Sequence, residues 1–247
     1  MKKIMPKIAL SVFALTVLFS ATSCKKDKTY NLNLGITYKV GTEAFAYNQV
    51  YTIGGVAVKF TLAQMYLSGI HIEDDDANEG HYDDKYLLIK PSIATYALGE
   101  LTNKEISHLH EVKFNVGIDS TTNHQTTDMF NARPATDVLS VQNPAMHWSW
   151  NSGYIFVKIE GMVDTDADGT PETAAEFHIG MDSYLQAVAL TTHKDLEDGD
   201  NTISLNFNVA KLFDGVNLAT EYVTHTMDNM TLAGKVKANL AAAFSAN

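Results

Sequence analysis

The strongest constraint on the fold is a repeated alternation of apolar and polar residues. In YNLNLGITY (30–38), every second residue from Leu32 to Tyr38 is apolar, and HEVKFNVGID (110–119) and ISLNFNV (203–209) repeat the pattern. A period of two puts apolar side chains on one face of a strand and polar side chains on the other. Half-buried strands of this kind are typical of antiparallel sheets.

Shorter apolar or alternating stretches recur along the rest of the chain. They are VAVKF (56–60), MYLSGIHI (65–72), KYLLI (85–89), YIFVKIEG (154–161), EFHIG (176–180) and QAVAL (186–190). No alternation of strands with long helices separates them, so the pattern excludes a parallel α/β fold. We expect a mainly β chain that folds as a single-domain antiparallel β-sandwich.

Two segments predict helices within this β framework. TNKEISHLH (102–110) offers Thr102 as an N-cap with Glu105 three residues later, and TLAGKVKANLAAAF (231–244) is a longer C-terminal helix. Residues 119–146, in contrast, are polar and contain two prolines. Long connections of this kind commonly carry function or are disordered.

The first 24 residues indicate export. Basic residues precede an apolar run from Ile8 to Phe19, and small polar residues follow before Cys24, the only cysteine. This run is too short for a membrane span and is typical of a signal peptide. A lone cysteine at its end predicts acylation of Cys24, with a signal peptide of 1–23 and a domain of 24–247. The alternative is ordinary cleavage that leaves a free thiol.

The charge of the chain limits its partners. Lys and Arg number 18 against 29 Asp and Glu, a formal net charge of −11. Removal of the signal peptide takes away Lys2, Lys3 and Lys7, so the exported chain is more acidic still. Such a chain is a poor ligand for nucleic acid, and we expect membrane contact only through a lipid anchor.

The sequence contains no motif of a hydrolytic enzyme. Nucleophile elbows, glycine-rich phosphate loops and HExxH are all absent. Among the nine histidines, only His108 and His110 form a close pair, and they are a candidate pair of metal ligands. We therefore expect a binding protein and not an enzyme.

The acidic stretch DTDADGTPE (164–172) resembles the start of a calcium loop. Asp164, Asp166 and Asp168 alternate before Gly169, which permits a sharp turn. The Glu usual at the twelfth position is missing, because Ala175 stands there, and Glu172 and Glu176 are the candidate replacements. The alternative is an acidic hairpin turn without a metal.

Both tryptophans of the chain stand side by side, at Trp148 and Trp150. On an extended backbone they share one face with Met146, so packing in the core is one explanation. An intact indole is a poor metal ligand because its nitrogen only donates.

The surroundings of this pair resemble a known family. The matching residues are M-x-W-x-W-x-x-G-Y-x-F at Met146, Trp148, Trp150, Gly153, Tyr154 and Phe156, N-H at Asn123 and His124, and F-H-I-G at 177–180. The order and spacing are similar to those of the MbnP family of periplasmic copper-binding proteins. In methanotroph-type members, a cysteine-bearing segment follows the motif that corresponds to F-H-I-G at 177–180, and this segment is absent here. In this respect the chain resembles a branch of the family that consists of lipoproteins from other bacteria.

The resemblance implies a function and a site. In this family a partner di-haem cytochrome c peroxidase oxidises the first tryptophan to kynurenine, and the product binds one Cu(I) together with histidines. Here it implies Trp148 as the modified residue and His124 and His178 as ligands, with Trp150 and Met146 as structural partners. The expected protein is a lipid-anchored, copper-binding protein of the Gram-negative cell envelope. The alternative is a calcium-stabilised surface lipoprotein without copper.

Overall fold

The computed structural model describes residues 28–148 and 153–247. The expected signal peptide, Cys24 and Trp150 lie outside the described residues. Within the described ranges, no helix is both long and apolar enough to cross a membrane.

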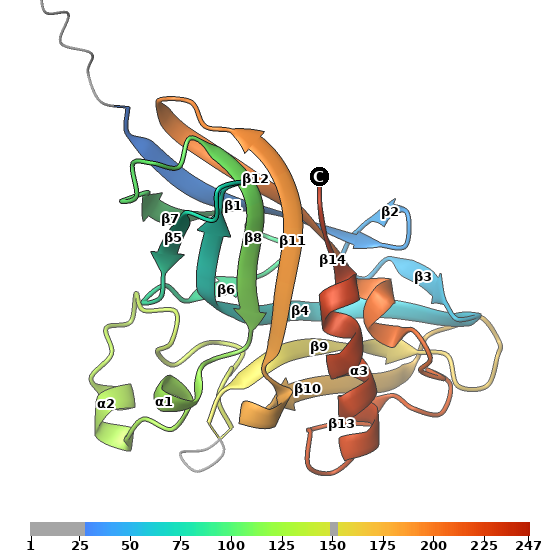
Figure 1. Ribbon diagram of the computed structural model, residues 1–247. Helices are drawn as coiled ribbons and strands as arrows, with labels where there is room; N and C mark the ends of the chain where they lie inside the picture. Colours follow the sequence, from blue (N-terminus) through green and yellow to red (C-terminus); the bar gives the residue numbers. More distant parts are fainter. Residues whose placement is uncertain (1–27, 149–152) are drawn as a thin grey trace, which may run out of the picture.

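Two β-sheets make up most of the structure (Figure 1). The first sheet contains β1 (Tyr30–Val40), β2 (Glu43–Ala44), β7 (Thr95–Glu100), β12 (Gly199–Asn208) and β14 (Phe244–Ala246). The second contains β3 (Val50–Ile53), β4 (Val56–Glu73), β5 (Glu79–Tyr82), β6 (Leu87–Ile89), β8 (His108–Val116), β9 (Ile155–Val163), β10 (Thr173–Gly180), β11 (Gln186–Asp195) and β13 (Val223–Thr224). The mainly β, sandwich-like prediction is confirmed.

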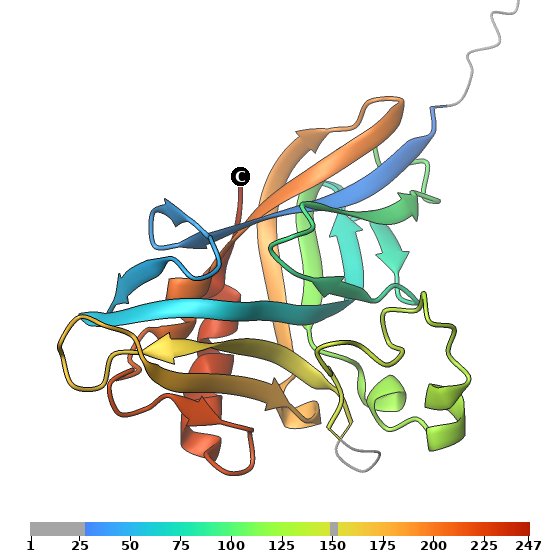
Figure 2. The same cartoon turned by 180° about the vertical axis from the view of Figure 1, so that it is seen from behind.

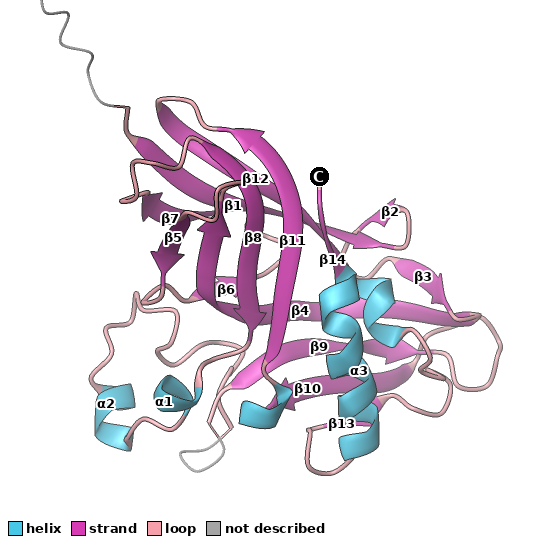
Figure 3. Cartoon of the chain, viewed as in Figure 1, coloured by secondary structure: helices cyan, strands magenta, loops and turns pink. Residues whose placement is uncertain are grey.

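Among the residues that the structure describes, the longest helix packs against β10 and β11, whereas the two short α-helices lie beyond the end of β8, as Figure 3 shows. The helices are α1 (Ser120–Asn123), α2 (Thr127–Asn131), α3 (Met230–Ala243) and two 3₁₀ turns, η1 (Asp182–Tyr184) and η2 (Val209–Phe213). The C-terminal helix α3 confirms the prediction for 231–244. Leu232, Val236 and Leu240 recur every four residues and are fully buried, so one face of α3 packs on the core.

The pairing of the strands is mostly antiparallel, with one long exception. β1 lies parallel to β12 over ten residue pairs, from Tyr30 with Gly199 to Lys39 with Asn208. Alternate side chains of β1 are buried, as its sequence pattern predicts. The two apolar stretches at 56–60 and 65–72 belong to a single strand, β4, which crosses the second sheet (Figure 2).

The helix expected at 102–110 is wrong. Residues 104 and 105 form a turn, in which the side chain of Asn103 accepts a hydrogen bond from the backbone N–H of Glu105 (3.1 Å). His108 and Leu109 instead begin β8 and pair with Asp195 and Lys194 of β11. A nine-residue helix is marginal without tertiary support, and the long ladder with β11 stabilises the extended form.

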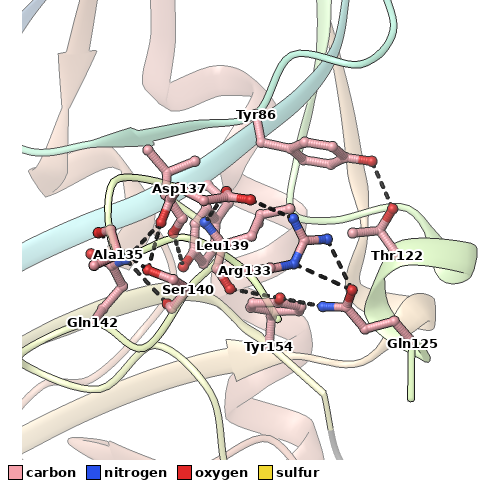
Figure 4. A network of polar contacts seen from close by, with 12 residues as sticks. Tyr86, Thr122, Gln125, Arg133, Ala135, Asp137, Leu139, Ser140, Gln142 and Tyr154 are labelled. Carbon is pink, nitrogen blue, oxygen red and sulfur yellow. Dashed lines mark hydrogen bonds and ion pairs between the residues drawn. The ribbon is translucent and has the colours of Figure 1, made fainter. Parts of the chain in front are cut away.

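The polar connection at 119–146 contains α1 and α2. Figure 4 shows the network of polar contacts that holds it in place. Arg133 donates to Asp137 (Nη1 to Oδ2, 2.6 Å) and to Gln125 (Nη2 to Oε1, 2.9 Å). Gln125 in turn donates to the Tyr154 hydroxyl (2.6 Å), which donates to the carbonyl of Leu139 (2.8 Å). This network fixes the connection against the start of β9 and so positions α1.

Candidate metal site around Trp148

A cavity of about 580 Å³ lies where α1, the end of β10 and the loop after β13 meet. Its walls are formed by His124, Trp148, Met181, Asp182, Ser183, His225 and Met227. The sequence separation of these residues is large, so only the folded sheet and its connections bring them together. The cavity combines imidazoles and thioethers with one indole.

Trp148 is held in place by both its backbone and its ring. Its N–H donates to the carbonyl of Gly153 (3.1 Å), and its ring lies directly over Gly180. A Cβ atom at position 180 would lie 2.6 Å from Cζ3 of the indole. A second hollow of about 320 Å³ also touches Trp148, together with Met146 and His147. The side chain of Trp148 therefore contributes to the walls of two cavities.

Met146, the expected structural partner, is buried in a smaller core cluster with Phe130 and Tyr154. Its carbonyl accepts a hydrogen bond from the backbone N–H of Ile155 (2.9 Å). Met146 thus anchors the segment that presents Trp148.

His178 lies on β10 beside His225, which follows β13. The parallel pairing of Phe177 with Thr224 places the two histidines next to each other, with ring centroids 4.9 Å apart. One oxygen of Glu176 and one nitrogen from each imidazole lie within 4.8 Å of one another. These three side chains form a compact group of potential metal ligands.

The environment of His178 keeps its imidazole neutral. Burial lowers the pKa of His178, and the opposing effect of the contact between its Nε2 and Glu160 Oε1 (2.9 Å) is smaller. Glu160 also contacts Lys158 (3.2 Å), which balances the carboxylate charge. A neutral imidazole retains a lone pair for a metal ion.

The loop after β13 fixes the position of His225. Its Nδ1 lies 2.8 Å from Asp228 Oδ2, and its Nε2 lies 2.9 Å from Glu176 Oε2. The contact with Asp228 is the main cause of a raised pKa of His225. Thr226, at a φ of 66°, is held by hydrogen bonds from its hydroxyl to the carbonyl of His178 (2.9 Å) and from the N–H of Gly180 (3.0 Å). A residue with a positive φ that several hydrogen bonds hold in place often occurs at a functional site.

His124 reaches the cavity from the end of α1. Its Nε2 lies 3.1 Å from Asp182 Oδ2, while the buried Asn123 donates to the other oxygen of Asp182 (2.8 Å). Asn123 also accepts from the backbone N–H of Tyr154 (2.8 Å). Burial raises the pKa of Asp182, but hydrogen bonds from Ser120 and Asn123 outweigh it, so the pKa is lowered and Asp182 is anionic.

The structure brings part of the expected copper site together. His124 and Trp148 line one cavity, and His178 lies behind it against His225. Reasoning from sequence did not select His225, because an isolated histidine in a polar turn carries no pattern. His225 and Met227, two residues apart in the chain, both line the cavity.

The expected calcium residues lie in the loop between β9 and β10. One carboxylate oxygen from each of Asp164, Asp166 and Asp168 lies within 4.8 Å of the others. The Asp164 carboxylate already accepts from the N–H groups of Ala167 and Gly169 (both 2.8 Å). The negative charge of Asp168 is the main cause of a raised pKa of Glu172. The loop thus concentrates negative charge around Asp164, which also stabilises the turn.

Comparisons with known proteins identify the family. The MbnP family model matches residues 29–231. The fold is similar to that of MbnP from Methylosinus trichosporium, with 15% sequence identity, a TM-score of 0.52, and coverage of 76% of this chain and 78% of that chain. No curated protein matches the sequence. Because the family model spans most of its length, the chain belongs to the MbnP family.

Proposed function

We propose that this chain is a copper-binding protein of the cell envelope, not itself an enzyme, that holds one Cu(I) beside Trp148. One observation carries the proposal. The indole borders a cavity that is also lined by His124, His225 and two methionines, with His178 packed directly behind. Imidazole and thioether donors are the neutral ligands that copper in its lower oxidation state accepts.

The role of Trp148 in this site requires a change in its chemistry. Oxidative cleavage of the indole C2–C3 bond, with two equivalents of peroxide as the oxidant, gives N-formylkynurenine and two water molecules. Hydrolysis then releases the former C2 atom as formate and leaves kynurenine, whose aryl amine and ketone supply lone pairs that the indole lacks. The proposed ligands are the modified Trp148, His124 and His178. His225 becomes a further imidazole ligand when its Nε2 leaves the Glu176 carboxylate and binds the ion instead.

Carboxylates support this assignment, because each candidate imidazole contacts one. His124 lies against Asp182, His178 against Glu160, and His225 against Asp228 and Glu176. Carboxylates that contact the second nitrogen of a ligating histidine fix the orientation of its ring. The same acidic groups compensate the charge of a bound cation without being ligands themselves.

We further propose the cellular setting that the family resemblance implies. A di-haem cytochrome c peroxidase is the partner that supplies the oxidising power for Trp148. Acylation of Cys24 retains the domain at a membrane of a Gram-negative envelope. Nucleic acid is not a partner, since the chain is strongly acidic.

The decisive experiment compares protein exported with and without the cognate peroxidase. Intact mass and a peptide map report on Trp148, and metal analysis after exposure to Cu(I) reports on copper. Coexpression should convert Trp148 to kynurenine and give one tightly bound copper per chain. Trp148→Phe should preserve the fold, because one aromatic ring replaces another, and should abolish tight binding.

The matched variants locate the copper. His124→Ala combined with His178→Ala should abolish binding, whereas His81→Ala, an exposed histidine far from the cavity, should leave it unchanged. Trp150→Phe should weaken binding less than Trp148→Phe. Stoichiometric copper with unmodified Trp148 would refute the kynurenine step, and binding that survives loss of both histidines would refute the site.

A further inference from the structure

The nine histidines fall into three groups at different places on the molecule. His124, His147, His178 and His225 lie around the cavity or next to Trp148. Among the others, His108 and His110 of β8 and His193 of β11 gather at the far ends of these two strands, together with Asp75. In Figure 1 this end of β8 and β11 lies opposite to α1 and β13.

A β-bulge brings the three histidines together. Glu111 pairs with Thr191 and Leu109 pairs with Lys194, so both Thr192 and His193 stand opposite His110. A bulge of this kind turns a side chain away from the regular alternation and is common beside functional sites. As a result, the ring of His193 lies 5.2 Å from that of His110 and 6.0 Å from that of His108.

Asp75 is presented by a rigid turn after β4. The neighbouring Asp74 accepts hydrogen bonds from the N–H groups of Asp76 (2.9 Å) and Asn78 (2.8 Å), and from the side-chain amide of Asn78 (2.8 Å). These contacts fix the turn without using the carboxylate of Asp75. That carboxylate is therefore directed to the histidines by a preformed backbone.

The donor atoms converge on the two oxygens of Asp75. Oδ1 lies 2.9 Å from His110 Nδ1, and Oδ2 lies 3.7 Å from His108 Nε2. One ligand atom from each of Asp75, His110 and His193 lies within 4.8 Å of the others. His110 Nδ1 is buried, yet the geometry of its approach to Asp75 is not that of a hydrogen bond. A buried nitrogen without a hydrogen bond is costly and is available to an ion.

A further carboxylate positions His108. Its Nδ1 lies 2.8 Å from Asp195 Oδ1, which leaves Nε2 on the side of Asp75. A carboxylate on the second nitrogen of a histidine is the usual outer partner of a metal-binding imidazole. The cluster therefore contains both direct donors and an orienting group.

We propose that His108, His110, His193 and Asp75 form a second metal site, separate from the cavity, which binds one divalent ion of the Zn²⁺ or Cu²⁺ class. Asp75, His110 and His193 supply three ligand atoms that already converge, and His108, whose Nε2 lies 3.7 Å from Asp75 Oδ2, is the fourth ligand after a small movement of its ring. Three imidazoles and one carboxylate are the ligand types and the number of a tetrahedral zinc site. The absence of thiolate and thioether donors favours the divalent ions over Cu(I). Asp195 is a positioning residue. The proposal does not depend on the copper function.

Zn²⁺ alone is the probe, because it is redox-inert. Calorimetric titration uses a background with His178→Ala and His225→Ala, so that the cavity does not contribute. We expect one Zn²⁺ per chain. Adding His110→Ala and His193→Ala to this background should remove the binding step, because both variants delete a direct ligand. Their effect on affinity should exceed the ~10–100-fold weakening that is typical when a residue that only orients a ligand is changed. Asp195→Asn should give a weakening within that range.

His71→Ala is the matched control, since His71 lies on the neighbouring strand in a separate contact with His81 and Asp83. It should leave the binding step unchanged. In the unaltered chain, Zn²⁺ should shift the imidazole NMR resonances of His108, His110 and His193 together, which tests the site without any variant. Absence of stoichiometric Zn²⁺ binding, its survival without His110 and His193, or its loss in the His71 control would overturn the proposal.

Discussion

At the scale of single residues, Gly180 decides where the indole of Trp148 can lie. A Cβ atom at this position would stand 2.6 Å from both the indole Cζ3 and the carbonyl oxygen of Tyr154. The carbonyl belongs to the backbone and cannot rotate away. Gly180→Ala should therefore displace Trp148 from the cavity wall and destabilise the fold by ~1–3 kcal/mol.

Tryptophan fluorescence and chemical denaturation measure the two effects, and copper binding should weaken with the displacement. Gly234→Ala is the control, because nothing lies within 4 Å of its added Cβ and the residue sits inside α3. That variant should stabilise the protein by ~0.5–1 kcal/mol. An unchanged emission spectrum and copper affinity in Gly180→Ala would contradict the role of this contact.

The same scale shows what a sequence can reveal about a site. Trp148, His124 and His178 stood out only because their surroundings resemble a family motif. His225 had no such neighbours, and its place depends on β13 pairing with β10 from a distant part of the chain. Long-range parallel pairing leaves no local pattern, so this residue could only be found in the folded structure.

At the scale of elements, the alternation of apolar and polar residues predicted most strands. The prediction of a helix failed where a segment pairs with a distant strand. The apolar faces of β1, β8 and β12 are those that the period of two indicates. Residues 102–110 carried a plausible capping pattern, but β11 extends its ladder to His108 and excludes the helix. Local propensity is a weak guide when a neighbouring strand offers hydrogen bonds.

The loop between β9 and β10 carries the calcium prediction. Asp164 stabilises the turn through backbone N–H groups, while Asp166, Asp168 and Glu172 concentrate uncompensated charge around it. A cation that relieves this repulsion binds only the folded loop and should raise stability, by about 2.7 kcal/mol at a free concentration 100 times Kd. Thermal unfolding with added calcium and with chelator measures the shift in Tm.

Asp166→Asn with Asp168→Asn should remove the calcium response and retain the turn, because Asp164 remains. Asp76→Asn is the control, since it removes one charge from a comparable turn that Asp74 stabilises through backbone N–H groups. If the Tm of calcium-free protein does not change on addition of calcium, the loop is an acidic turn without a metal.

At the scale of the whole molecule, the cavity and the first residues of β1 lie at opposite ends. β8 runs from His108 to Val116, about 30 Å at the usual rise of a strand. Its last residue pairs with Gln186 next to η1, on the side of the cavity. Its first residue lies near the turn that Thr29 contacts through Asp198 (2.9 Å) and Gly199 (2.8 Å). Figures 1 and 2 show the N-terminal end of β1 on that far side.

This arrangement gives a testable consequence of the lipid anchor at Cys24. Only a few residues separate Cys24 from Tyr30, a reach of at most about 20 Å. An acylated chain would therefore hold the end with His108 near the membrane and direct the cavity away from it, accessible to a soluble partner. Cys24→Ser should release the protein from membranes or leave it unprocessed, whereas Lys25→Ser, a change in the tether alone, should not.

Membrane fractionation and metal analysis of the same preparations test both parts of this prediction. The soluble, processed form of Cys24→Ser should bind copper with the affinity of the parent, because the cavity lies at the other end of the molecule and uses no residue of the tether. A variant that fractionates with membranes as the parent does would contradict the anchor. A soluble, folded variant that has lost copper would show that the anchored end contributes to the site, contrary to the separation of the two ends along β8 and β11.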